Sequence, residues 1–151
     1  MIHSIELGEA LITVWRGQPS QKDVDDSLVA AKRMRARVGK PLVLVSVMAP
    51  DTRMPADDVR KSMDANWPKL VEVASTIQYV IMPRGSSALD HLISSRLFSL
   101  CVGVYALAKV GKPISVHRSL DTALTEIADL APSLPLAEIR RLVTAALKAP
   151  T

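Results

Sequence analysis

Cysteine is nearly absent from this chain of 151 residues, which contains only Cys101. A single cysteine excludes an internal disulfide, and Cys101 lies in an apolar helical stretch where we expect a buried, unreactive thiol. Residues 1–7 show no basic region followed by an apolar stretch, so we expect no export signal. Both observations favour a reducing, cytoplasmic location.

Aromatic residues and long apolar runs are also scarce. Aromatic side chains make up 3% of the chain, so aliphatic residues and methionine must fill the core. A hydrophobic fraction of 48% with 23% charged residues is typical of a globular protein, and the length suits one domain. The longest apolar stretch, residues 97–110, is shorter than the roughly 20 residues that a membrane span needs, which predicts a buried helix.

The chain lacks the common sequence signatures of enzymes. It has no G-x-G-x-x-G motif and no G-x-x-x-x-G-K-[ST] motif, and Ser86 and Ser87 lack the G-x-S-x-G context that exposes a nucleophile. His3, His91 and His117 lie far apart, and no two of them have the i, i+4 spacing that places two imidazoles on one helix face. We therefore expect no enzyme activity, no metal and no cofactor.

The formal net charge of +4 is not accompanied by a nucleic-acid signature. The densest basic group follows three aspartates on one predicted helix, and the helix dipole favours this order of acid before base. No aromatic residues alternate with these cations, as stacking on bases requires. We expect no nucleic-acid binding. The basic group consists of Lys32, Arg33, Arg35, Arg37 and Lys40.

Three short, apolar, β-branched runs, each followed by an amphipathic stretch, form the clearest structural pattern. They are residues 41–48, 76–82 and 113–117. Strands that alternate with helices form parallel sheets. Two further β-rich segments, residues 1–7 and 10–15, are separated by a two-residue turn, which predicts an antiparallel hairpin. The expected fold class is therefore α/β, with a mixed sheet that has an N-terminal hairpin and helices packed against it.

Capping residues and prolines predict where the first two helices begin and end. Ser20 is a good N-cap for the first helix, which a glycine ends. A second helix is expected to begin at Pro55. Because Pro68 lacks a backbone donor, we expect a kink or break in this helix near Asn66 and Trp67.

The third predicted helix is apolar on more than one face. Either Ser86 or Ser87 can cap it. One apolar stripe is expected to pack on the sheet, while Phe98, Val102 and Tyr105 form a second stripe that needs a partner. We expect this second stripe to dock a protein partner or a second copy of the chain, which makes a homodimer the expected assembly.

The chain is expected to form one domain with an added terminal helix. Residues 1–131 make up the α/β domain, and residues 132–151 contribute a C-terminal helix, roughly 135–148, packed on the same domain. The sequence shows no internal repeat and no linker long enough to divide it.

The loops that follow the predicted parallel strands provide a candidate binding site. Such loops leave a sheet at the same edge. Two arginines near helix N-termini can hold an anion there, because unpaired N–H groups favour negative charge. The alternative interpretation is that the loops carry only solvated residues and helix caps. The candidate anion-binding residues are Arg53, Arg84, Gly85 and Ser86.

Residues 17–23, 42–55 and 115–128, together with the order of the elements, resemble the STAS domain of anti-sigma-factor antagonists. The likeness is greatest to the SpoIIAA-like group of small bacterial proteins and covers roughly residues 1–131. It implies a regulatory module that is read by a protein partner.

The resemblance also implies two kinds of site. STAS antagonists carry a phosphorylatable Ser or Thr, usually preceded by Asp, where the second helix begins, and Asp51 and Thr52 match this pair. In this chain Arg53, Met54 and Pro55 stand where the family has small residues and a glycine. Other SpoIIAA-like proteins resemble lipid-carrier domains with a groove beneath a mobile helix, which implies an apolar ligand.

Two functions of different classes follow from the sequence. The first is a non-catalytic regulatory or protein-interaction module that associates with itself through the third helix. The alternative is the binding of a small anionic or amphipathic, lipid-like ligand at the strand-end loops.

Overall fold

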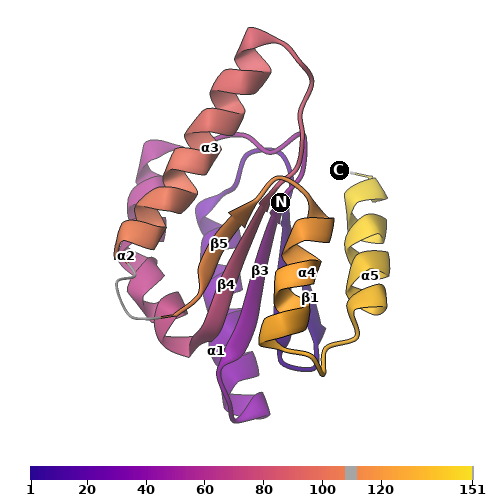
Figure 1. Cartoon of the computed structure of the whole chain (residues 1–151). Helices are drawn as coiled ribbons and strands as arrows, with labels where there is room; N and C mark the ends of the chain where they lie inside the picture. Colours follow the sequence, from indigo (N-terminus) through magenta and orange to yellow (C-terminus); the bar gives the residue numbers. More distant parts are fainter. Residues whose placement is uncertain (108–111, 151) are drawn as a thin grey trace.

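The computed structural model of the chain describes residues 1–107 and 112–150, and it describes the side chains of these residues apart from 100–107. Strands and helices alternate along most of the chain (Figure 1). In chain order they are β1 (Ile2–Leu7), β2 (Ala10–Trp15), α1 (Gln21–Val38), β3 (Leu42–Met48), α2 (Asp57–Val73), β4 (Ala74–Ile81), α3 (Ala88–Leu107), β5 (Ile114–His117), α4 (Leu120–Leu130) and α5 (Leu136–Lys148).

The strands form one sheet in which the spatial order is the sequence order, β1-β2-β3-β4-β5. β1 pairs with β2 in antiparallel fashion, and the pairs β2–β3, β3–β4 and β4–β5 are parallel. This result confirms the predicted α/β fold with a mixed sheet and an N-terminal hairpin. Because β2 to β5 run in the same direction, their carboxyl ends lie at one edge of the sheet.

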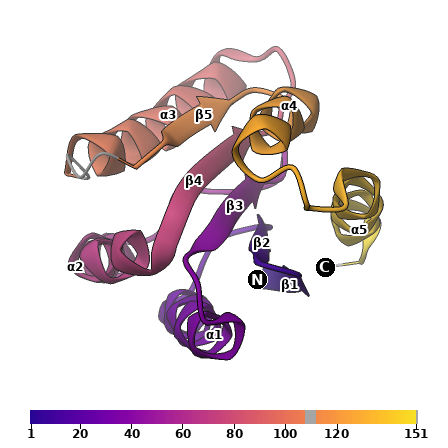
Figure 2. The same cartoon turned by 60° about the horizontal axis from the view of Figure 1, so that its bottom comes forward.

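The helices cover both faces of the sheet (Figure 2). Each parallel connection moves one strand further in the same direction, and such connections are almost always right-handed. α1, α2 and α3 therefore share one face, where Met34, Trp67 and Leu97 belong to the same buried cluster. α4 and α5 cover the other face, where Ile127 and Ile139 are fully buried.

Local hydrogen bonds fix the start of α1. The Ser20 hydroxyl accepts a hydrogen bond from the Asp23 amide at 3.2 Å, and the Asp23 carboxylate accepts one from the Ser20 amide at 2.9 Å. Burial alone would raise the pKa of the Asp23 carboxyl, but the hydrogen bonds from Ser20 and the nearby N-terminal ammonium group together outweigh it and hold this pKa below its usual range. Gly39, with a φ of 76°, ends the helix as predicted.

The break expected near Asn66 and Trp67 is wrong, because α2 continues through Pro68 to its end. A proline at this position removes one hydrogen bond to the carbonyl of Asp64. Asp64 and Pro68 are exposed, so water can reach that carbonyl. Trp67 and Val71 are buried against the sheet on the opposite side, and this packing keeps the helix in place.

Ser87, rather than Ser86, caps α3. The Ser87 hydroxyl accepts a hydrogen bond from the Asp90 amide at 3.1 Å, and the Asp90 carboxylate accepts one from the Ser87 amide at 3.2 Å. Ser86 is exposed beside this cap. In the described part of the chain, no helix combines the length and the hydropathy needed to cross a membrane.

The layer formed by α4 predicts a large difference between two positions of that helix. Ile127 is fully buried, whereas Leu130 is 43% exposed. Ile127→Ala should lower the free energy of unfolding by about 2–5 kcal/mol, because it leaves a cavity. Leu130→Ala, the matched control, should change it by about 0.5 kcal/mol or less. Urea unfolding followed by circular dichroism measures both, and equal effects would contradict the described packing of α4.

Candidate functional site

The first two loops at the carboxyl edge are joined by hydrogen bonds. The Thr52 hydroxyl donates to the Trp15 carbonyl at 2.7 Å, and the Arg53 amide donates to the Gly17 carbonyl at 2.8 Å. Arg16 lies 3.2 Å from the Asp51 carboxylate. The loops after β2 and β3 therefore form one continuous rim.

Arg84 fastens the loop after β4 to this rim. Its guanidinium donates a hydrogen bond to the Thr52 carbonyl, and its Nε lies 3.8 Å from a carboxylate oxygen of Asp90. A hydrogen bond from the Ser87 hydroxyl and the charge of Arg84 hold the pKa of the Asp90 carboxyl below its usual range. The side chain of Arg84 is only 10% exposed. Arg84 therefore links two loops and is not a free anchor for an anion.

The structure brings the predicted anion-binding residues to the same edge but not to one pocket. Arg84 contacts the Thr52 carbonyl, next to Arg53, yet of these two arginines only Arg53 lines a described cavity. Gly85 permits the close approach of Asp90, because a Cβ atom there would lie 2.7 Å from the carboxylate. Ser86 is exposed and lines neither of the two described pockets.

Thr52 is buried, with 1% of its surface exposed. Its hydroxyl donates to the Trp15 carbonyl, which also accepts from the Ala49 amide at 3.0 Å. In this conformation the hydroxyl is not accessible to a kinase. Phosphorylation of Thr52 stays a prediction, and it requires the rim to open.

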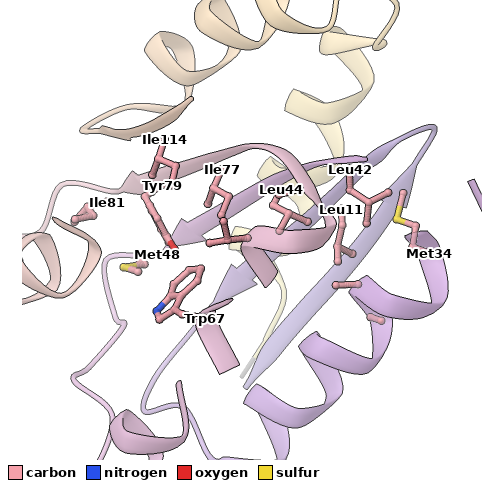
Figure 3. Close-up of a cluster of buried hydrophobic side chains, with 14 of the residues drawn as sticks. Leu11, Met34, Leu42, Leu44, Met48, Trp67, Ile77, Tyr79, Ile81 and Ile114 are labelled. Atoms are coloured by element: carbon pink, nitrogen blue, oxygen red, sulfur yellow. The ribbon is translucent and has the colours of Figure 1, made fainter. Parts of the chain in front are cut away.

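A cavity of about 80 Å³ lies beneath this rim, between the sheet and the helices α1 and α2. Figure 3 shows part of its wall, where Leu44, Ile77 and Tyr79 project from the sheet toward Trp67 of α2. Arg53 stands at the rim of the same cavity. The residues that line it include Leu11, Thr13, Trp15, Val24, Ser27, Leu28, Leu44, Ser46, Met48, Thr52, Met63, Asn66, Leu70 and Leu97.

The register of the sheet explains why space remains at this position. Leu11, Leu44 and Ile77 are paired neighbours and form an apolar row across β2, β3 and β4. The next row on the same face has Thr13 and Ser46 beside Tyr79. Two small side chains fill less space than the leucines of the neighbouring row. The polar row is therefore the floor of the cavity.

Polar atoms in the cavity are few and mostly paired. The Thr13 and Ser46 hydroxyls lie 3.1 Å apart, and Trp15 Nε1 donates to the Thr13 hydroxyl at 3.0 Å. The ring of Trp67 contacts Tyr79 edge-on, with ring centres 5.6 Å apart. Trp67 Nε1 is buried and has no hydrogen-bond acceptor among the described residues. A buried donor without a partner is uncommon in native structures.

A groove of about 240 Å³ lies between α3 and the carboxyl ends of β4 and β5. Phe98, a member of the predicted interaction stripe, lines this groove and is 41% exposed. The side chains of Val102 and Tyr105 lie outside the described ones. The groove is lined by Ile81, Met82, Pro83, His91, Ser94, Ser95, Phe98, His117 and Arg118.

The residue pattern did not predict this cavity, although the STAS resemblance implies a groove with an apolar ligand. Thr13 and Ser46 are the only visible signals, because each is a polar residue within an otherwise apolar buried strand. Their meaning depends on the register that places them side by side. The sequence also showed no sign that Trp67 lines a cavity, because a helix break was expected near this residue.

No metal centre is found among residues 1–107 and 112–150, where no three His, Cys, Asp or Glu side chains lie close enough to hold an ion. Comparisons with protein-family models, with curated proteins and with solved structures found no match to this chain. The resemblance to STAS domains therefore stays a prediction.

The contact between Thr52 and Trp15 predicts a stability difference that depends on the hydroxyl. Thr52→Val should lower the free energy of unfolding by about 1 kcal/mol, because one buried hydrogen bond is lost while Ala49 still satisfies the carbonyl. Thr52→Ser keeps the hydroxyl and controls for the bond itself. Thr144→Val, at an exposed position of α5, controls for the added methyl group. If urea unfolding shows no difference between Thr52→Val and Thr52→Ser, the bond does not hold the rim.

Proposed function

We propose that this chain is a non-catalytic, cytoplasmic module that binds a small, mostly apolar ligand carrying a hydrogen-bond acceptor. The ligand occupies the cavity between the sheet and α1 and α2. The observation that carries this proposal is that Trp67 lines an apolar cavity and that its buried Nε1 has no acceptor among the described residues.

The energetics of the cavity favour such a ligand. Leaving a buried donor unpaired costs about 1–3 kcal/mol, which an acceptor on the ligand would offset. Apolar surface removed from water adds roughly 25 cal/mol per Å². A ligand with both properties fits the wall better than a purely polar or purely apolar molecule.

The rim supports a ligand with an exposed polar end. Pro19, Thr52 and Pro55 line the cavity near the carboxyl edge, where Arg53 is exposed. Because Arg53 makes no ion pair among the described residues, its guanidinium is available to an anionic group at the opening. This arrangement favours an amphipathic molecule whose apolar body enters first.

A matched pair of probes tests the role of Trp67. Trp15 and Trp67 are the only tryptophans of the chain and both line the cavity, so tryptophan fluorescence reports binding. Cyclohexanone carries an acceptor, whereas methylenecyclohexane has nearly the same shape without one. Trp67→Phe should lower the affinity for cyclohexanone about fivefold and leave the affinity for methylenecyclohexane nearly unchanged. An equal effect on both probes would show that Nε1 donates no bond to the ligand.

A cavity-filling substitution tests the location of the ligand. Ser46→Leu places a large apolar side chain on the floor of the cavity. It should abolish binding of cyclohexanone while the protein stays folded. Ser4→Leu is the control, because Ser4 is an exposed residue of β1. Circular dichroism checks the fold of both variants. If Ser46→Leu is folded and still binds with the original affinity, the ligand lies elsewhere.

Self-association through α3 is the second candidate, and the apolar exposure of this helix favours it. Leu89, Leu92 and Phe98 are 64%, 49% and 41% exposed. Exposed apolar side chains on one element are typical of a contact surface. The order of elements from β1 to α4 is also the order that the STAS resemblance implies, which supports a regulatory role read by a protein partner.

Sedimentation analysis distinguishes this second candidate. If α3 forms a homodimer, Leu92→Asp combined with Phe98→Asp should convert the dimer to a monomer, because buried unpaired carboxylates oppose association. Val29→Asp on α1 is the control, since Val29 is 62% exposed. A wild-type protein that is monomeric at high concentration would exclude self-association.

A further inference from the structure

The groove beside α3 is lined by one arginine and two histidines, and the cavity function does not use it. His91, Ser94, Ser95 and Phe98 have the i, i+3, i+4, i+7 spacing of one helix face, and all four line the groove. His117 and Arg118, from the end of β5, line it as well. None of the described lining residues is acidic. The groove therefore places three groups that can carry positive charge around one space.

A hydrogen-bond chain fixes the orientation of the His117 ring. Thr76 Oγ1 donates its only proton to the Pro113 carbonyl at 2.7 Å, so it accepts from Gln78 Nε2 at 2.9 Å. The amide oxygen of Gln78 then lies 2.6 Å from His117 Nε2. Because a carbonyl oxygen only accepts, His117 Nε2 must carry a proton.

This arrangement makes His117 Nε2 a donor toward β4 and α4. Glu126 also contacts Nε2, at 3.1 Å, and accepts a hydrogen bond from the Ser115 hydroxyl at 2.7 Å. Groups on β4 and α4 therefore hold the ring from behind, as residues behind a ligand-binding histidine commonly do. His117 belongs to a fixed wall of the groove.

Among the charged residues near the groove, Asp90 is already engaged, whereas Arg118 is not. Asp90, the acidic neighbour of His91, accepts hydrogen bonds from Ser87 and faces Arg84. Arg118 is exposed and makes no ion pair among the described residues. Its guanidinium is therefore free to form a bidentate pair with a carboxylate.

We propose that the groove between α3 and the end of β5 binds a small carboxylate with a compact apolar body. The Arg118 guanidinium binds the carboxylate between His91 and His117, and the hydroxyls of Ser94 and Ser95 can donate to the same group. The apolar body covers Phe98 and the segment that ends β4. This site is separate from the cavity beneath the rim and does not depend on the function proposed for it.

Benzoate and benzamide are the probes, because they share a ring and differ in charge. Benzoate should bind at least tenfold more tightly than benzamide. In NMR spectra the ring signals of His91 and His117 should move on adding benzoate, while those of His3, on the distant strand β1, stay in place. Equal affinities for the two probes, or equal shifts at all three histidines, would overturn the proposal.

Substitutions locate the carboxylate. Arg118→Gln should lower the affinity for benzoate about tenfold and leave the affinity for benzamide unchanged. Arg96 is an exposed arginine of α3 outside the groove lining, so Arg96→Gln should change neither affinity. Inorganic phosphate should bind less tightly than benzoate. Phe98→Ala should lower the affinity for benzoate and leave the affinity for phosphate unchanged. Equal effects of the two arginine substitutions, or phosphate binding as tight as benzoate, would contradict the proposed ligand class.

The folded Ser46→Leu variant separates this site from the cavity. If benzoate binds in the groove, filling the cavity leaves its affinity unchanged. Loss of benzoate binding in Ser46→Leu, with the fold intact by circular dichroism, would place benzoate in the cavity and overturn the proposed groove site.

Discussion

The parallel pairing of β2 to β5 is the constraint on which the rest of the structure depends. Parallel neighbours cannot be joined by a hairpin, so each pair needs a crossover, and here every crossover is a helix. The strands follow sequence order, and right-handed crossovers therefore place α1, α2 and α3 on the same face. The same pairing brings the loops after β2, β3, β4 and β5 to one edge, where Thr52 and Arg84 join the first three of these loops.

The cavity and the groove meet different sides of α3. Leu97 lines the cavity, whereas the next residue, Phe98, lines the groove. α3 therefore separates an apolar space above the sheet from a more polar space at the end of β5. Movement of this helix would change both spaces together, which provides a physical route by which one ligand could influence the other.

The sequence was sufficient for the fold class because its signals are local. Apolar runs indicate strands, and the capping pair at Ser20 and the glycine at position 39 bound the first helix. The outcome at Pro68 shows the limit of such signals, since burial of Trp67 and Val71 keeps α2 continuous despite the proline. Tertiary packing was stronger than the local preference there.

The sites were less predictable because they depend on pairing between distant segments. Thr13 and Ser46 look like isolated polar residues until the register places them side by side. Arg84 looked like an anion anchor, but its charge is used by the Thr52 carbonyl and Asp90. Composition identifies charged residues but not their partners, and the partners decide which charges are free.

The face covered by α1 and α2 encloses a space of about 80 Å³ that is lined mainly by apolar side chains. A crystal of the protein exposed to pressurised xenon shows whether an apolar guest enters this space, because xenon occupies apolar cavities. We expect a xenon atom enclosed by Trp15, Leu44 and Trp67. Side chains that close the space, with no xenon among these three residues, would contradict this expectation.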